Sequence, residues 1–304
     1  MRRVGEDREE SIRQRLRNEV HRRGEDAQFA LQRYAMERLL FRLGESKHRE
    51  RFVLKGAMLF ALWGGSAYRP TRDLDFTGYG APDSASVLQA FREICAARSF
   101  DDGLVFDVDA MTSEAIRDQS EYVGLRLHLK AILGSSRIPL QIDIGFGNAI
   151  EPHPVDAQFP TLLDDPPPRI RAYPQEAVVA EKTHALVVLG ERNSRFKDFY
   201  DLFVLASQFS FEGARLTLAI ATTFERRSTR IEVTLPLGLA SRFYQDPARS
   251  EQWRAYLSRN SLPGAPSDFV AVGDLLQRFL APLWNACAAS QSFNAGWPRG
   301  GPWG

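Results

Sequence analysis

The chain has 304 residues and a formal net charge of +1 at pH 7, and hydrophobic and charged residues make up 44% and 25% of it. These fractions are typical of soluble globular proteins and exclude an intrinsically disordered chain, and the length allows one large domain or two ordinary ones. The balanced charge excludes a uniformly basic protein, so any contact with RNA must come from a local basic surface.

Two cysteines, Cys95 and Cys287, are too few for a disulfide scaffold and lack the spacing of metal ligands. The N-terminal residues lack the apolar region of a signal peptide, and no window approaches the roughly 18 apolar residues of a membrane span. We therefore expect a cytoplasmic protein with buried free thiols and no membrane partner.

The first half of the chain predicts helices followed by a mixed sheet. Residues 1 to 50 have a helical pattern, and the apolar stretch 51–63 predicts a further helix that ends at Gly64-Gly65. A strand carrying Asp73 and Asp75 follows, and 87–97 predicts an amphipathic helix. The next expected strands cover 104–111, 122–132 and 138–146. Because Gly134-Ser135-Ser136 predicts a hairpin between the last two, we expect an α+β fold with a mixed-sheet core over 51–160.

The second half predicts a helical domain. Residues 164–168 are the best linker candidate, because three successive prolines neither continue a helix nor join a central strand. Apolar residues then recur at helical spacing, and the expected helices cover 175–189, 196–208, 213–224, 250–259 and 270–290. We predict N-terminal helices over 1–50, a helical C-terminal domain over 170–290, and a flexible tail over 291–304, which is rich in Gly and Pro.

Asp73 and Asp75 are the strongest indication of function. Side chains alternate along a strand, so these two carboxylates share one face with Arg69 and Thr71. Adjacent carboxylates repel each other and are costly to hold together without a cation. Mg²⁺ prefers oxygen ligands and often completes its shell with substrate phosphates, so we predict a site for a metal–nucleotide complex.

Asp143 would join this site if its strand lay beside that of Asp73 and Asp75. Two-metal phosphoryl transfer requires such a cluster of acids. The alternative is that Asp143 is an outward-facing strand residue. Asp107 and Asp109 form a second acidic pair, which we interpret as the solvated face of an antiparallel strand.

The helical half adds a lysine and two acids. Lys182 lies in an apolar helix, where it either contacts a triphosphate or extends along the surface. Asp198 and Asp201 share a face of the next helix, beside Arg195. They form a surface ion-pair network, or one of them reaches Lys182 or the substrate.

Several glycines and arginines are weaker indications of a phosphate-binding or RNA-binding site. Gly56 and Gly64-Gly65 allow the backbone to approach a phosphate closely, or simply form turns. A small cluster that could contact RNA, or be merely solvated, consists of Arg226, Arg227 and Arg230.

Taken in order, these segments resemble the AbiEii/AbiGii toxin family of nucleotidyltransferases, within the DNA polymerase β-like superfamily. The resemblance covers about residues 50–205 and rests on 52–59, 69–75, 142–144, Glu181-Lys182 and 195–202. The superfamily usually has Gly-Gly or Gly-Ser before the acids, whereas this chain has Gly56-Ala57 and offers only backbone N–H groups there.

The resemblance implies a polymerase β-like nucleotidyltransferase core in which Asp73 and Asp75 bind Mg²⁺, with Asp143 as the third metal ligand. It also implies that Lys182 contacts the phosphates of the NTP and that Asp198 completes the catalytic site. Asp201 and Arg195 are secondary candidates. The further nucleotide contacts that we expect are Lys55, Gly56, Arg69 and Thr71.

The implied function is that of a toxin in a type IV toxin–antitoxin or phage-defence system. Such a toxin transfers NMP from an NTP to RNA, with the tRNA 3′ end as the expected acceptor, and so blocks translation. Its partners would be an NTP, RNA or tRNA, and a cognate antitoxin. Two alternatives stay open: transfer of NMP or phosphate to a protein hydroxyl, and a non-catalytic nucleotide-binding or antitoxin-binding module.

Overall fold

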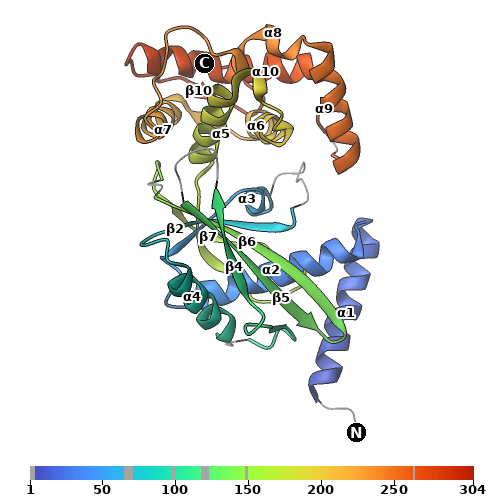
Figure 1. Ribbon diagram of the computed structural model, residues 1–304. Helices are drawn as coiled ribbons and strands as arrows, with labels where there is room; N and C mark the ends of the chain where they lie inside the picture. Colours follow the sequence, from blue (N-terminus) through green and yellow to red (C-terminus); the bar gives the residue numbers. More distant parts are fainter. Residues whose placement is uncertain (1–3, 65–70, 98–99, 118–122, 148–149, 263) are drawn as a thin grey trace. The chain divides into compact units, whose positions relative to one another are not determined.

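The computed structural model describes residues 4–64, 71–97, 100–117, 123–147, 150–262 and 264–304 (Figure 1). The chain divides into two compact units. Of the described residues, those up to 147 and 155–172 belong to the first unit, and 150–154 and those from 173 onward belong to the second. Among the described residues, no helix is both long enough and apolar enough to cross a membrane.

An eight-stranded mixed sheet forms the centre of the first unit, in the order β3-β5-β6-β2-β1-β8-β7 with β4 also paired to β5. Strand β2 runs antiparallel to β1 and parallel to β6, and β5 and β6 form the predicted hairpin. The strands are β1 (Phe52–Lys55), β2 (Asp73–Gly78), β3 (Val105–Phe106), β4 (Thr112–Arg117), β5 (Val123–Leu133), β6 (Ser136–Phe146), β7 (Val155–Gln158) and β8 (Arg169–Ala172).

Two expectations about this sheet are wrong. Residues 52–55 form a strand because their backbone pairs with β2 and β8, and the apolar side chains at 52–54 are buried. Only the short helix α3 (Met58–Leu62) remains of the helix expected over 51–63. The strand expected over 104–111 ends at Phe106. Asp107 then accepts a hydrogen bond from the Ala110 N–H, so Asp107 and Asp109 lie in a turn and not on a strand face.

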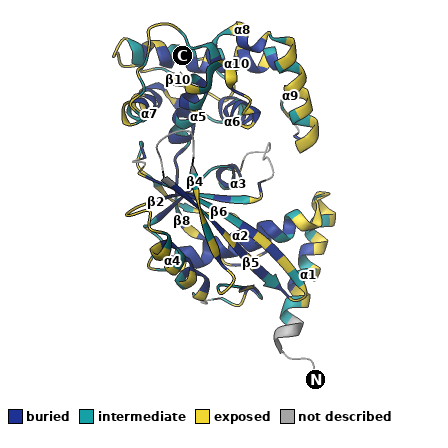
Figure 2. Ribbon diagram, viewed as in Figure 1, coloured by how far each residue is buried: buried dark blue, intermediate teal, exposed yellow. Residues whose placement is uncertain are grey.

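One face of the sheet is apolar and covered by helices. Buried and partly exposed positions alternate along the second half of β6 (Figure 2). The side chains of Ile142, Ile144 and Phe146 are the buried ones. Helices α2 (Ala27–Glu45) and α4 (Ser84–Ala96) pack on the sheet and on each other (Figure 1). The opposite face of β1, β2 and β6 therefore carries the polar side chains, and it is there that the acids lie.

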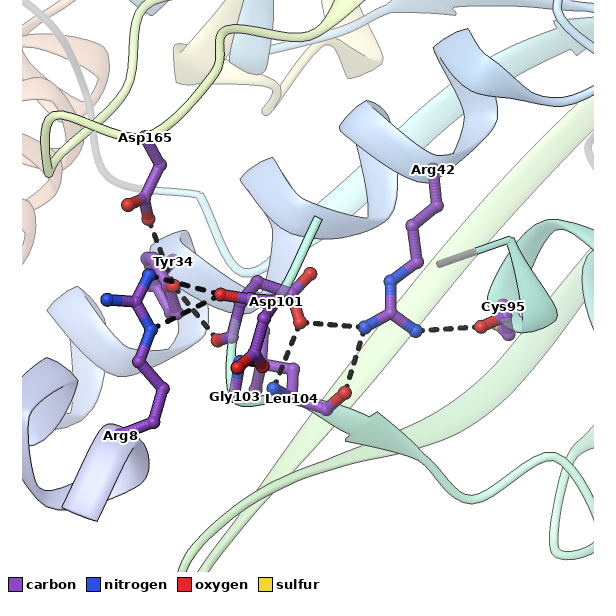
Figure 3. A network of polar contacts seen from close by, with 9 residues as sticks. Arg8, Tyr34, Arg42, Cys95, Asp101, Gly103, Leu104 and Asp165 are labelled. Carbon is purple, nitrogen blue, oxygen red and sulfur yellow. Dashed lines mark hydrogen bonds and ion pairs between the residues drawn. The ribbon is translucent and has the colours of Figure 1, made fainter. Parts of the chain in front are cut away.

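A buried polar network fastens α2 to two loops of the first unit (Figure 3). Arg42 donates to Asp102 Oδ1 and to the Cys95 and Leu104 carbonyls, each at 2.7–2.8 Å. The Tyr34 hydroxyl contacts Asp165 Oδ2 at 3.0 Å. Asp165 is only 7% exposed, so the stretch expected to be a linker is instead packed into the first unit. Helix α1 (Val4–Arg23) joins this network through Arg8, which donates to the Asp101 carbonyl.

The second unit is mainly helical, as predicted. Its aromatic core includes Phe199 stacked on Phe243, with ring centroids 5.4 Å apart, and the buried Trp253. The helices are α5 (Gln175–Leu189), α6 (Phe196–Gln208), α7 (Gly213–Arg226), α8 (Ser241–Tyr244), α9 (Pro247–Asn260) and α10 (Phe269–Ala288), with two 3-10 turns, η1 (Gly190–Arg192) and η2 (Leu237–Leu239).

The prediction of a flexible tail over 291–304 is wrong. Strand β10 (Gly296–Trp297) pairs with β9 (Phe211–Glu212), and Trp297 is 1% exposed. The Trp297 indole donates to the Ala206 carbonyl at 2.7 Å, and Trp303 stacks on Phe279. The glycines and prolines prevent a helix, but the two tryptophans bury enough apolar surface to hold the segment in place.

Glu37, in the middle of α2, predicts a pH-dependent stability. It is fully buried between Arg33 and the Leu162 N–H, and burial raises its pKa from 4.5 to about 7. Because the fold favours the protonated form, ionisation of Glu37 should lower the free energy of unfolding by up to about 3 kcal/mol as the pH rises from 4.5 to 7.

Urea unfolding of the wild type and of Glu37→Gln between pH 4.5 and 8 tests this. The stability of the wild type relative to the variant should fall up to pH 7 and then level off. Glu45→Gln, at an exposed position of the same helix, should show no such difference. A difference between wild type and Glu37→Gln that did not vary with pH would contradict the assignment.

Candidate active site

A row of charged residues crosses the polar face of the first unit's sheet. In strand register, Lys55 lies opposite Asp75, Asp75 opposite Asp143, Asp143 opposite Arg126, and Arg126 opposite Glu114. Neighbours in register point to the same face, with Cβ atoms about 5 Å apart. The parallel pairing of β2 and β6 thus brings Asp75 beside Asp143, and each acid has a cation on its other side.

Gly56 makes room for the Asp75 carboxylate. Its φ of +74° is a conformation that favours glycine, and a Cβ added there would overlap Asp75 Oδ2. The backbone at Gly56 therefore lies directly against this carboxylate. Ala57, which follows, is 2% exposed and forms the N-cap of α3, where it makes no side-chain hydrogen bond.

Gly145 likewise makes room for a charged side chain, that of Lys55. A Cβ added at Gly145 would come 3.2 Å from Lys55 Nζ, so the absent side chain leaves space for the ammonium over β6. Lys55 is the antiparallel neighbour of Asp75, and its charge lies on the same face of the sheet as the acids.

Asp143 is bound by Arg126, a residue outside the motifs that predicted the site. Arg126 Nε donates to Asp143 Oδ1 and Nη2 donates to Oδ2, both at 2.8 Å, and Gln141 lies 3.4–3.5 Å from the same oxygens. The hydrogen bonds to the Asp143 carboxylate raise the pKa of the Arg126 guanidinium above its ordinary value. The signal was present in the hairpin: counting seven residues back from Leu133 and seven forward from Ser136 pairs Arg126 with Asp143.

The residues before β2 are only partly described. Asp73 begins the strand, two residues from Asp75 and therefore on the same face. Thr71 is buried, and its hydroxyl lies 3.3 Å from the Asp73 carbonyl and 3.4 Å from the Asp73 N–H. Arg69, a predicted nucleotide contact, lies outside the described residues, as does Gly65.

In the second unit, Lys182 joins the two acids of α6. Its ammonium lies 2.8 Å from both Asp198 Oδ1 and Asp201 Oδ2, and each aspartate side chain is 1% exposed. Arg195 Nε lies 2.8 Å from Asp198 Oδ2, with its side chain 47% exposed. The two acids are thus part of a buried ionic cluster and not of a surface ion-pair network. Asp198 contacts Lys182, which was the other arrangement expected from the sequence.

Nearby, His184 has a structural role. Arg227 can only donate, so its contact with Nδ1 at 3.2 Å places the ring hydrogen on Nε2, which donates to Thr229. Burial, together with the charge of Arg227, lowers the His184 pKa to about 4, so the ring is neutral. Arg227 also pairs with Glu181 at 3.4 Å, which leaves the predicted basic cluster of Arg226, Arg227 and Arg230 partly engaged within the unit.

The first unit offers the donors that a hard divalent cation requires. Asp73 and Asp75 share a face, Asp75 lies against Gly56, and Asp143 follows on the next strand. Among the described residues, however, no three His, Cys, Asp or Glu side chains are grouped closely enough to hold a metal ion. Both oxygens of Asp143 are bound to Arg126, which lies on β5, the strand on the other side of β6 from β2.

The family described as "Nucleotidyl transferase AbiEii toxin, Type IV TA system" matches residues 38–278. This is most of the chain, and the protein belongs to that family. It is a nucleotidyltransferase of the toxin class, as the resemblance implied.

Two solved structures from Helicobacter pylori are similar, JHP933 and one titled a "putative nucleotidyltransferase". Each has a TM-score of 0.51 and 15% identity over 87% of this chain, and the match covers 95% and 98% of the respective structures. At this identity the likeness shows the fold alone. A comparison with curated proteins finds no match.

Substitution of Gly56 tests the close approach to Asp75. Gly56→Ala should lower the free energy of unfolding by about 1–2 kcal/mol for the positive φ and by a further 1–3 kcal/mol for the overlap, as measured by urea unfolding. Gly24→Ala is the matched control, because Gly24 has a φ of +64° and no described atom within 4 Å of an added Cβ. Equal losses in the two variants would contradict the proximity of Gly56 to Asp75.

Removal of Lys182 should destabilise the second unit. Lys182→Ala leaves the buried carboxylates of Asp198 and Asp201 without this ammonium, which should cost about 3–5 kcal/mol in thermal or urea unfolding. Lys197→Ala, at an exposed position of α6, should change stability by less than about 0.5 kcal/mol. A Lys182→Ala protein as stable as the wild type would show that the ion pairs do not form in solution.

Proposed function

We propose that this nucleotidyltransferase transfers NMP from an NTP to RNA in a Mg²⁺-dependent reaction, with the tRNA 3′ end as acceptor, and that the transfer blocks translation. The observation that carries the proposal is the placement of Asp75 beside Asp143, with Asp73 on the same face and Gly56 against the Asp75 carboxylate. A cognate antitoxin would be its protein partner, in keeping with the type IV toxin family.

Asp73 and Asp75 would hold the Mg²⁺ that accompanies the NTP, and Asp143 would be the third ligand. The ion would neutralise charge on the triphosphate and lower the pKa of the attacking hydroxyl. Lys55 supplies a cation at the edge of this group, where it can bind a phosphate oxygen. The space that a side chain at Gly56 would fill is taken by the Asp75 carboxylate, so Gly56 would serve the nucleotide site by allowing this metal ligand to lie against the backbone.

Lys182 is proposed to bind the phosphates of the NTP, and Asp198 to act with it. Their contacts support a division of labour in which Asp198 and Asp201 fix the position of the ammonium, while Arg195 adds charge beside Asp198. A lysine held by two buried acids loses little further conformational freedom when it binds a substrate, which favours binding.

The acceptor is tested by incubating the purified protein with total RNA or with protein fractions, and with each of the four NTPs labelled at the α-phosphate or, separately, at the γ-phosphate. The expected result is label on RNA of tRNA length, dependent on Mg²⁺. Label on protein, or transfer only from γ-labelled NTP, would overturn RNA nucleotidylation and favour modification of a protein hydroxyl. Nucleotide binding without transfer to either would overturn catalysis.

Asp73→Asn and Asp75→Asn should each reduce the labelling of RNA by more than about a hundredfold, because each removes one ligand charge and keeps the side-chain shape. Their melting temperatures should stay within a few degrees of the wild type. Asp109→Asn, in the exposed turn after β3, is the control and should retain full activity. A fully active Asp75→Asn protein would refute the proposed site.

A further inference from the structure

We infer that Arg126 is a latch that holds Asp143 away from the metal site and passes to Glu114 when Asp143 is recruited. The inference rests on the proposed function, because it concerns how that same site acquires its third acid. It assigns Arg126 and Glu114 as positioning residues.

In the resting structure, Arg126 holds both oxygens of the Asp143 carboxylate. Both of its oxygens accept hydrogen bonds from one guanidinium at 2.8 Å, in the bidentate arrangement that is the strongest common pairing of a carboxylate. Strand β5, which carries Arg126, and strand β2, which carries Asp75, lie on opposite sides of β6. While the Arg126 guanidinium holds both oxygens, only their remaining lone pairs are open to a cation at Asp75, so Asp143 becomes a full ligand of that cation by giving up part of its bond to Arg126.

The charges in the row explain why this resting arrangement is stable. Asp75 and Asp143 are neighbours in register, and their mutual repulsion is offset by Lys55 on one side and Arg126 on the other. The guanidinium thus does for Asp143 what a bound cation would do. A metal ion that binds Asp143 must compete with it.

Glu114 supplies the second position for the arginine. It lies opposite Arg126 on β4, on the side away from Asp143. Its present contact is with His128, at 3.3 Å, and both of these side chains are more than half exposed, so the contact is weak and easily exchanged. The Arg126 side chain is 33% exposed, which leaves it room to move towards Glu114.

Substitutions of Arg126 and Glu114 should change the affinity for a metal ion in opposite directions. Without Arg126, Asp143 is free to bind a cation, so Arg126→Gln should tighten Mn²⁺ binding by about tenfold. Without Glu114, the released guanidinium loses the acid opposite it on β4, and Asp73, the other acid whose charge acts on Arg126, would be bound to the metal. Glu114→Gln should therefore weaken Mn²⁺ binding by about threefold. Both effects should vanish in an Asp143→Asn background, because each acts through Asp143.

Mn²⁺ titration of the full chain without nucleotide, followed by electron paramagnetic resonance of the free ion, measures these affinities. Arg137→Gln, which removes an exposed cation from the same hairpin, is the control for net charge and should leave the affinity unchanged. Thermal melting without metal verifies that each variant is folded. The opposite shift expected for Glu114→Gln keeps the test decisive even if Arg126→Gln is unstable.

The outcomes separate this inference from the proposed function. If Asp75→Asn abolishes Mn²⁺ binding but Arg126→Gln binds no more tightly than the wild type, the latch is wrong and the metal site stands. The latch is also wrong if Glu114→Gln binds as tightly as the wild type, or if either effect persists with Asp143→Asn. If Asp75→Asn leaves Mn²⁺ binding unchanged, the inference and the proposed function both fail. If neither the wild type nor Arg126→Gln binds Mn²⁺, the latch is wrong, whereas the proposed function, in which the ion accompanies the NTP, stands.

Discussion

The candidate site depends on one constraint, the parallel pairing of β2 with β6 that sets Asp75 opposite Asp143. Side chains in a strand alternate between faces, so a shift of this register by one residue would send one acid to the helix-covered face and leave a buried charge without a partner. The buried Ile142 and Ile144 on that face hold the register in place. Gly56 and Gly145 then admit Asp75 and Lys55 into close contact with the neighbouring backbone.

In each unit, the clustered acids are neutralised by basic side chains of the same unit. In the first, Lys55 and Arg126 flank Asp75 and Asp143, and in the second, Lys182 and Arg195 contact Asp198 and Asp201. Ionised carboxylates this close together, or this deeply buried, are stable only with such partners. Two of these cations, Lys55 and Lys182, are also those proposed to bind the phosphates of the NTP.

Sequence patterns predicted the parts of this protein that depend on local signals. The β5–β6 hairpin, the helices of the second unit and the acids on β2 follow from turn residues and periodicity, and the family match confirms the nucleotidyltransferase class. The strand at Phe52–Lys55 was missed because its apolar run suits a buried strand as well as a helix, and only its pairing with β2 and β8 decides. The packed tail and the burial of Asp165 depend equally on distant partners, Phe279 and Tyr34. Arg126 could have been found from the hairpin register, whereas the opposition of Asp75 and Asp143 could not, since no local signal sets a parallel register.

The most direct test of the central claim is to locate the metal. A crystal of the full chain soaked with Mn²⁺ and a non-hydrolysable NTP analogue would give an anomalous signal at each bound ion. The account predicts a peak within about 2.5 Å of Asp73 and Asp75 oxygens, with the triphosphate beside it and Asp143 turned towards it. A nucleotide-bound ion elsewhere, with the polar face of β2 and β6 vacant, would contradict it.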